Sequence, residues 1–314
     1  PHAAFAYGVL TDAYIEMGKY DSAIVMVDSM CAIRPDLTSY SRISYLREIY
    51  GDIPGSIEAM KSALNAGIPR MEQTEWVRVY LGRLYELNGK LDTAEYYYQT
   101  ANAMRPNYAH AIAGLGRIER QRKNYTLAIT YFQQAGSLVT DYSFGDELID
   151  LYRLNNQPKK SDSMAKEVVK LLSVHANTDD RNPDAGHYAD KELAYVYLKT
   201  GENDLALKHA EAEYKRRPDN IDVNEMMAWT WYKRGEWNKC LPFIEKAMRT
   251  GSKNPGLLCR AGLIYYKNNQ HEKGLALLQE AIAINPYLNE DLMQEAEAYV
   301  SKTDSQVADV SSGL

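Results

Sequence analysis

Three carboxylates on one predicted helix come closest, in type and spacing, to acid–base chemistry: Asp146, Glu147 and Asp150. A general acid and a general base need titratable groups within hydrogen-bond reach of one substrate. Helix surfaces are ordinarily charged, however, so the cluster is better explained as a solvated face. The sequence also has no G-x-S-x-G motif and no glycine-rich loop of the kinds that cradle phosphate. We therefore predict no catalytic residue and no enzyme activity.

The cysteines and histidines do not form a metal or redox motif either. Cys240 and Cys259 lack C-x-x-C spacing, and we interpret them as packed thiols, with a redox pair between neighbouring helices as the alternative. The six histidines have neither H-x-x-x-H nor H-E-x-x-H spacing. Their densest patch, which shares residues 175–187 with several aspartates, is interpreted as a solvated loop. We predict no metal and no cofactor.

The elements that must position these side chains repeat along the chain. MGKYDSAIVMV (17–27), NGKLDTAEYYY (88–98) and TGENDLALKHA (200–210) each contain a glycine turn, a polar pair, a small residue and an amphipathic helix. The small residue recurs at Ala23, Ser56, Ala94, Ala128, Ser161, Ala206, Cys240 and Gly274. The gaps between these positions are 33, 38, 34, 33, 45, 34 and 34 residues. A period of about 34 residues predicts two helices per unit.

The small residues have a packing reason. Two antiparallel helices approach closely only where the side chains at their crossing have little bulk. The facing helix also supplies small residues, with Ile149 as the exception, at Thr11, Ser44, Gly82, Gly116, Ala194, Ala228 and Gly262. The glycines between the two helices, such as Gly18 and Gly51, favour the left-handed backbone conformation that ends a helix.

This pattern resembles the tetratricopeptide repeat over about 285 of the 314 residues. The segments AYGVLTDAYIEMGKYDSA and LGRLYELNGKLDTAEYYYQTA further resemble a bacterial subfamily of tetratricopeptide proteins. Members of that subfamily often carry more repeats and an export signal upstream, so the resemblance implies a missing N-terminal portion. It makes an exported or periplasmic location plausible and leaves a cytoplasmic one open. It implies no particular partner.

The predicted fold is all-α, a right-handed α–α superhelix of about eight helix–turn–helix repeats within residues 1–300. The predicted repeats are residues 4–36, 37–72, 75–108, 109–141, 142–172, 187–220, 221–253 and 255–287. A capping helix is predicted at 288–301, with Glu290 and Asp291 on its water-facing side. Residues 173–186 are predicted to be an exposed loop and possible hinge, and residues 303–314 a disordered tail.

Composition excludes two classes of partner. The net charge is −6, whereas a general nucleic-acid binder needs a basic face. No apolar run approaches the roughly 18 residues of a membrane-spanning helix, so we predict no membrane insertion by this segment.

The first unit, AAFAYGVL, is apolar and has no polar outer face. We expect a monomer or a weak homodimer that pairs through this unit.

In a tetratricopeptide superhelix the first helix of each unit lines the concave groove. Inward positions of these helices carry arginine and aromatic residues, the types that dominate binding hot spots. The predicted binding residues are Arg42, Tyr45, Trp76, Tyr80, Arg83, Arg117, Arg120, Tyr188, Tyr195, Trp229 and Tyr232. The alternatives are that the rings pack against the neighbouring unit and that the arginines form a solvated face.

We therefore expect a non-catalytic scaffold that binds a peptide or helix of a protein partner in the concave groove. The arginines would attract acidic residues of the partner, and the aromatic residues would anchor apolar ones. One alternative is a sensor of a small ligand such as a sugar or a peptidoglycan fragment. Another is an accessory domain of a larger enzyme or of a secretion or assembly complex.

Overall fold

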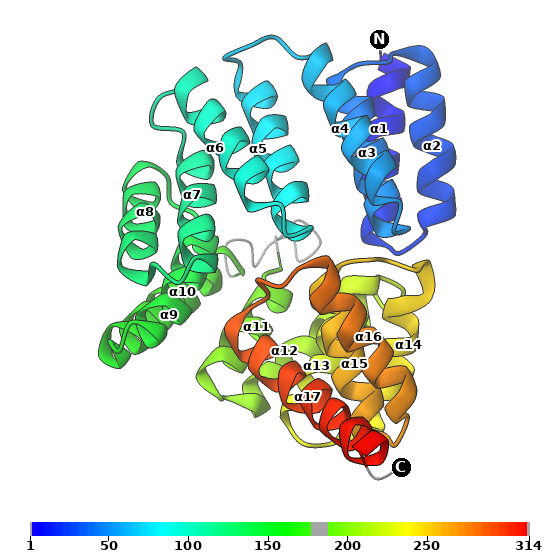
Figure 1. Cartoon of the computed structure of the whole chain (residues 1–314). Coiled ribbons are helices and arrows are strands. Elements are labelled where there is room, and N and C mark those ends of the chain that lie inside the picture. The colour runs from blue at the N-terminus through cyan, green and yellow to red at the C-terminus, as the bar shows by residue number, and fades with distance from the viewer. Residues whose placement is uncertain (1, 177–187, 313–314) are drawn as a thin grey trace.

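Each predicted unit is a pair of antiparallel helices in the computed structural model, which describes residues 2–176 and 188–312 (Figure 1). Within these residues there are helices and no strands, which confirms the all-α prediction. The first five pairs are α1 (His2–Glu16) with α2 (Tyr20–Ile33), α3 (Leu37–Ile49) with α4 (Ile53–Ala66), α5 (Glu72–Leu87) with α6 (Leu91–Met104), α7 (Ala109–Gln121) with α8 (Tyr125–Leu138), and α9 (Tyr142–Leu154) with α10 (Pro158–Ala176). The helices of the last units are α11 (Asp190–Thr200), α12 (Asn203–Arg216), α13 (Ile221–Lys233), α14 (Leu241–Ala247), α15 (Pro255–Lys267), α16 (His271–Ile284) and α17 (Glu290–Ser312).

The helix crossings have the geometry that the small residues predict. All eight repeated small positions are buried, from Ala23 to Gly274. A Cβ atom added to Gly82 would lie 2.7 Å from Cε1 of Tyr98, on the helix that crosses it. In the second unit the Ser44 hydroxyl donates to the backbone oxygen of Ser56 at 2.8 Å. Close approach at each crossing therefore joins the two helices of a unit.

The second helix of the seventh unit is irregular. It consists of a 3₁₀ turn, η1 (Trp237–Cys240), then α14, then a second 3₁₀ turn, η2 (Met248–Thr250). Pro242 stands in the first turn of α14. Proline has no amide hydrogen to donate and its ring crowds the preceding turn, so a continuous α-helix cannot run through this position.

Two segments differ in extent from the expectation. α10 continues to Ala176, so the segment predicted as an exposed loop begins inside this helix, and residues 177–186 of that loop lie outside the described residues. α17 runs to Ser312 and is therefore longer than the predicted cap of residues 288–301. Most of the segment expected to be a disordered tail is thus helical. Its sequence has no proline or glycine before Gly313, and helix propagation needs only one further hydrogen bond per residue.

The second turn of the superhelix lies against the first, so the first units contact the last ones (Figure 1). A Cβ atom on Gly18, between α1 and α2, would lie 2.1 Å from the backbone oxygen of Asp219, before α13. The same atom on Gly51 would lie 2.5 Å from the backbone oxygen of Gly251. On Gly89 it would lie 3.0 Å from the backbone oxygen of Ile284. The turns of units one, two and three therefore touch the ends of units six, seven and eight in register.

Hydrogen bonds hold this contact between the two ends. The Asn220 side chain donates to the backbone oxygen of Glu16 at 3.0 Å, and the Ile221 amide donates to the Tyr20 hydroxyl at 3.0 Å. The Arg249 guanidinium donates to the backbone oxygen of Gly18 at 2.9 Å. Successive turns of the superhelix are thus stacked on each other.

Candidate functional site

A cavity of about 790 Å³ lies between the two turns of the superhelix, among the described residues. Its wall is formed by the inner helices α5, α7, α9, α11 and α15, and by residues 285–297 at the start of α17. Seven cationic and seven anionic side chains line it, together with four tyrosines. We call this space the central cavity. Its lining is therefore balanced in charge, although arginines were expected to attract acidic residues of a partner in the groove.

The arginines of the third and fourth units meet at Glu86. Arg117 Nε donates to Glu86 Oε2 at 3.0 Å, and Arg83 Nη1 donates to Glu86 Oε1 at 2.8 Å. The Tyr98 hydroxyl donates to the same carboxylate at 2.6 Å. Glu86 is only 1% exposed. Burial opposes its ionisation, but the charges of Arg117 and Arg83 outweigh burial and lower the pKa of Glu86.

Arg120 joins the fourth unit to the fifth and to the C-terminal helix. Its guanidinium lies 2.6 Å from the carboxylate of Glu147 and 2.8 Å from that of Glu290, and 3.7 Å from Asp150. Burial disfavours the charged form of Glu147, yet the positive charges led by Arg120 lower its pKa to about 2. Glu290 was expected on the water-facing side of the cap. It instead faces Arg120, because stacking of the superhelical turns brings the start of α17 against α7 and α9.

Lys199 neutralises the remaining carboxylates of the fifth unit. Its ammonium lies 2.8 Å from Asp146 Oδ2 and 3.0 Å from Asp150 Oδ2. Burial raises the pKa of Asp146, and the nearby Lys199 offsets this only in part. The three carboxylates considered above for acid–base chemistry are therefore members of a continuous ion-pair network with Arg120 and Lys199.

A second, smaller hollow of about 290 Å³ opens on the third unit, and we call it the repeat-three hollow. Trp76, Tyr80, His110 and Phe144 supply its aromatic wall. The ring centroids of Trp76 and Tyr80 are 5.3 Å apart, and the Tyr80 hydroxyl donates to Glu48 at 2.9 Å. Trp76 is 45% exposed, whereas Tyr80 is half-buried. The hollow therefore presents an aromatic surface beside the paired arginines Arg83 and Arg117, which also line it.

Comparisons with known proteins agree with this architecture. Models of the tetratricopeptide repeat match residues 81–137 and 255–288. The chain is similar to the TPR repeat-containing protein YpiA of Bacillus subtilis (strain 168), with 20% identity over 306 residues, which are 96% of this chain and 69% of that protein. The chain therefore contains tetratricopeptide repeats within these two segments.

Two solved structures are also similar to this chain. One is a tetratricopeptide repeat protein from Parabacteroides merdae ATCC 43184, at 14% identity with a TM-score of 0.48, where the match covers 84% of this chain and 98% of that one. The other is the APC/C hetero-tetramer Cut9–Hcn1, at 13% identity with a TM-score of 0.50, covering 91% of this chain and 54% of that chain. At this identity the second match shows a common fold and nothing about partners.

The central cavity and the repeat-three hollow are together lined by six of the predicted binding residues. Arg120 and Tyr195 line the first, Trp76 and Tyr80 line the second, and Arg83 and Arg117 line both, so that six predicted residues meet at these two spaces.

Three other predicted residues lie away from both spaces. Arg42 forms an ion pair with Asp12 at 2.6 Å, and Tyr45 packs against the buried cluster between α1 and α3. Tyr188 is 38% exposed, and the guanidinium of Arg216 lies 4.2 Å from the centre of its ring. The arginines expected to attract a partner's acidic residues thus have acidic neighbours within the chain.

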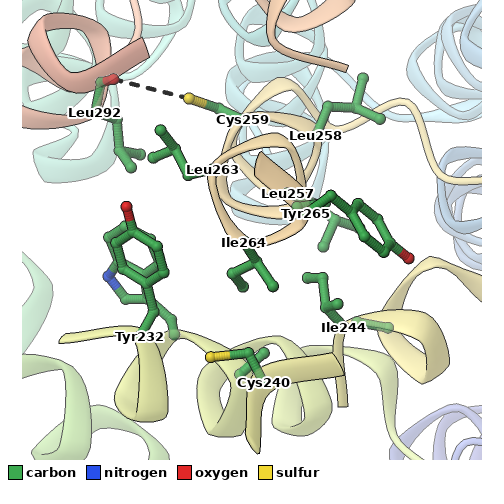
Figure 2. Close-up of a cluster of buried hydrophobic side chains, with 14 of the residues drawn as sticks. Tyr232, Cys240, Ile244, Leu257, Leu258, Cys259, Leu263, Ile264, Tyr265 and Leu292 are labelled. Atoms are coloured by element: carbon green, nitrogen blue, oxygen red, sulfur yellow. Dashed lines mark hydrogen bonds between the residues drawn. The ribbon is translucent and has the colours of Figure 1, made fainter. Parts of the chain in front are cut away.

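Trp229 and Tyr232, also predicted to line the groove, belong to the buried core around α15 (Figure 2). Their rings stack at a centroid distance of 4.7 Å, and Trp229 is only 8% exposed. The Tyr232 hydroxyl donates to Glu295 of α17, and the Arg260 guanidinium lies 5.4 Å from the Trp229 ring. These contacts account for both rings without a partner.

The cysteines of this core are packed thiols, as predicted. Cys240 and Cys259 are free and buried, and Figure 2 shows them on opposite sides of Ile264. The Cys259 thiol points to the backbone oxygen of Leu292 at 3.8 Å. Burial raises the pKa of both thiols to about 12. Both thiols are therefore protonated at neutral pH, which disfavours redox chemistry between them.

Sequence reasoning missed the residues that complete the network. Glu86, Lys199, Glu290 and Asp291 were not among the predicted binding residues. Asp291 lies 2.7 Å from the guanidinium of Arg153, more than a hundred residues earlier in the chain. No spacing in the sequence signals such a pair, because it depends on the curvature summed over several units.

The described residues give no indication of a metal site or a membrane span. No group of three or more histidine, cysteine, aspartate or glutamate side chains among them is arranged to hold a metal ion. The histidine and aspartate patch of the predicted loop lies largely outside this part of the chain. None of the described helices combines the length and the apolar character that a membrane crossing requires.

Proposed function

We propose that this tetratricopeptide repeat protein is a non-catalytic scaffold that binds a peptide or helix of a protein partner. Tetratricopeptide folds generally mediate protein–protein interaction, and proteins of this family are generally scaffolds without catalytic activity. The repeat-three hollow is the part of the concave face that we propose as the binding surface. The observation that carries this proposal is Trp76, a large aromatic side chain that is 45% exposed at the edge of an aromatic hollow.

The chemistry of the hollow favours an apolar or aromatic side chain of the partner over an acidic one. Arg83 and Arg117 already share the buried carboxylate of Glu86, so a further carboxylate would have to displace an internal partner. Trp76, Tyr80 and Phe144 instead offer ring surfaces that gain from burial by another apolar group. Exposed tryptophan beside a shaped hollow is typical of a binding hot spot.

The test compares two tryptophans of similar exposure. A photo-crosslinking amino acid at position 80 identifies the bound segment, which is then made as a peptide and titrated against the protein. We expect Trp76→Ala to weaken its binding about 30-fold or more, since loss of a hot-spot side chain costs at least about 2 kcal/mol. Trp237→Ala is the matched control, because Trp237 is 39% exposed and lines neither space. Equal affinity of the two variants would contradict the proposed site.

A further inference from the structure

The contact between the first and the last units joins two different edges of the helix stack. We call the edge with the turns inside the units the turn edge, and the edge with the connections between units the linker edge. Turns of the first three units lie against linkers that follow the last three: Gly18 at Asp219, Gly51 at Gly251 and Gly89 at Ile284. A turn edge and a linker edge of one chain therefore cover each other.

One further edge of each kind is exposed. The exposed linker edge follows units one, two and three and comprises residues 34–36, 67–71 and 105–107. In Figure 1 the connection from α4 to α5 lies at the top, on the side of these units that faces away from the later ones. The exposed turn edge contains Gly201, Gly235 and Asn269 of units six, seven and eight. No described atom lies within 4 Å of a Cβ atom added to Gly201 or Gly235.

The exposed linker edge has apolar side chains that the chain itself does not bury. Ile68 and Met71 of the second linker are 70% and 51% exposed. Ile33 and Met104, which end α2 and α6 at the neighbouring linkers, are exposed as well. A row of exposed apolar side chains along one edge, in contrast to scattered single ones, marks a contact surface. Burial of these side chains by a second surface would be favourable.

One position of the repeat can be compared on the covered and on the exposed turn edge. Tyr20 and Trp237 each stand two residues after the glycine of their turn. Tyr20 is buried, and its hydroxyl accepts from the Ile221 amide at the start of α13. Trp237 is 39% exposed, with the Lys267 ammonium 4.6 Å from its ring centre. The aromatic residue that the covered edge buries against a linker is therefore present, and exposed, on the other turn edge.

The covered and the exposed linkers share a short sequence. Arg-Pro-Asp stands at 217–219 in the covered linker and at 34–36 in the first exposed one, and Arg-Pro-Asn stands at 105–107. In the covered linker Arg217 forms an ion pair with Glu16, next to the turn of unit one. Arg34 and Arg105 have the same place on the exposed edge, where they pair with carboxylates of their own chain. Exposed pairs contribute little to stability, so these arginines can bind a carboxylate of another molecule, such as the exposed Glu202 of the turn edge.

We infer that a second copy of this chain binds by the contact that the chain already makes with itself. The turn edge of units six to eight of one copy lies on the linker edge of units one to three of the other. Trp237 is then buried against a linker of the neighbouring copy, as Tyr20 is within the chain. Because two different surfaces meet, the contact is head-to-tail, and the two ends of the row always leave one edge of each kind exposed. The result is an open row of copies that lengthens with protein concentration.

The first test measures the mass of the full chain at increasing concentration. Sedimentation equilibrium from micromolar to millimolar concentration should show an average mass that rises past that of two chains without a plateau. A mass that stays at one chain, or that stops at two, overturns the inference. The measurement contains no peptide, so its outcome is independent of the proposed scaffold function.

The second test disables one edge at a time. Ile68→Glu places a charge on the linker edge, and Trp237→Ala removes the ring from the turn edge. Each should weaken self-association about 30-fold or more, the effect of losing a hot-spot side chain. Tyr96→Ala is the control, because Tyr96 is 62% exposed and lies in the middle of α6, away from both edges. Circular dichroism checks that all three variants keep the fold, and equal association of a folded edge variant and the control contradicts the contact.

A mixture of the two edge variants tests the head-to-tail arrangement itself. Trp237→Ala keeps an intact linker edge, and Ile68→Glu keeps an intact turn edge. Together they should form a pair of one copy each with the affinity of the unchanged contact, and the mass should stop at two chains. Absence of this pair from the mixture would overturn the inference, because a contact between unlike edges needs only one intact edge from each copy.

Discussion

Replacing Gly18 by alanine tests whether the two ends of the superhelix are in contact. Gly18 has a φ of +71°, and an added Cβ atom would lie 2.1 Å from the backbone oxygen of Asp219. A left-handed conformation alone costs an alanine about 1–2 kcal/mol. Moving the turn away would also break the hydrogen bonds from Asn220 and Arg249, which contribute about 0.5–1.5 kcal/mol each. We expect the free energy of unfolding to fall by about 2–5 kcal/mol.

Gly201→Ala supplies the matched control for this experiment. Gly201 has a φ of +79°, but no atom lies within 4 Å of an added Cβ, so the variant should lose only the conformational share of about 1–2 kcal/mol. Urea unfolding followed by circular dichroism measures both values, and small-angle scattering reports whether the Gly18 variant opens. The pair Gly51→Ala and Gly251→Ala repeats the comparison at the next contact. Equal losses of stability within each pair would refute the contact between the ends.

Three further predictions concern the core and the ion pairs. Tyr98→Phe removes a hydrogen bond to a buried carboxylate and should lower the free energy of unfolding by about 1.5–3 kcal/mol. Tyr96→Phe, on the surface, should change it by less than about 0.5 kcal/mol in the same urea titration. Glu147→Gln should destabilise the protein at neutral pH. The pKa of Glu147 is lowered from 4.5 to about 2, so the stability lost in the variant is complete above about pH 4.5 and shrinks as the pH falls towards 2. Unfolding curves of both proteins at several pH values would show this. An aromatic disulfide reagent should label the half-buried Cys31 of the native protein first, and the two buried thiols only after denaturant is added; rapid labelling of all three would contradict the packing.

The helix pairs could be predicted from the sequence because their packing rule is local. A helix crossing excludes bulk, so residues such as Ala94 and Gly82 mark it wherever it occurs, and the 34-residue period follows from them. The turn between the helices has an equally local signature in Gly18 and Gly51, whose φ values are positive. Pro242 likewise stands at the irregular second helix of unit seven, although the irregularity itself was not predicted.

The candidate site was predicted only in part, because its geometry depends on distant units. Inward positions could be assigned one helix at a time, and this placed Trp76 and Arg117 on the concave face. Whether an inward side chain is open or covered depends on the path of the whole chain. Trp229 stacks on Tyr232, whose hydroxyl donates to Glu295 of α17, and Arg120 donates to Glu290 across 170 positions. These separations along the sequence are much longer than one repeat unit, so no pattern within a unit can predict the contacts.

Contact between the ends changes how the molecule is expected to unfold. In an open repeat array each unit touches only its neighbours, so the terminal units fray first and the array melts in steps. Here the Ile221 amide is bonded to a tyrosine 201 positions earlier, so neither end can detach without exposing part of the other. Such long-range closure adds loops that must form late in folding, which slows the search for the native state. It also couples the stability of the outermost helices, giving the array the cooperativity of a single domain.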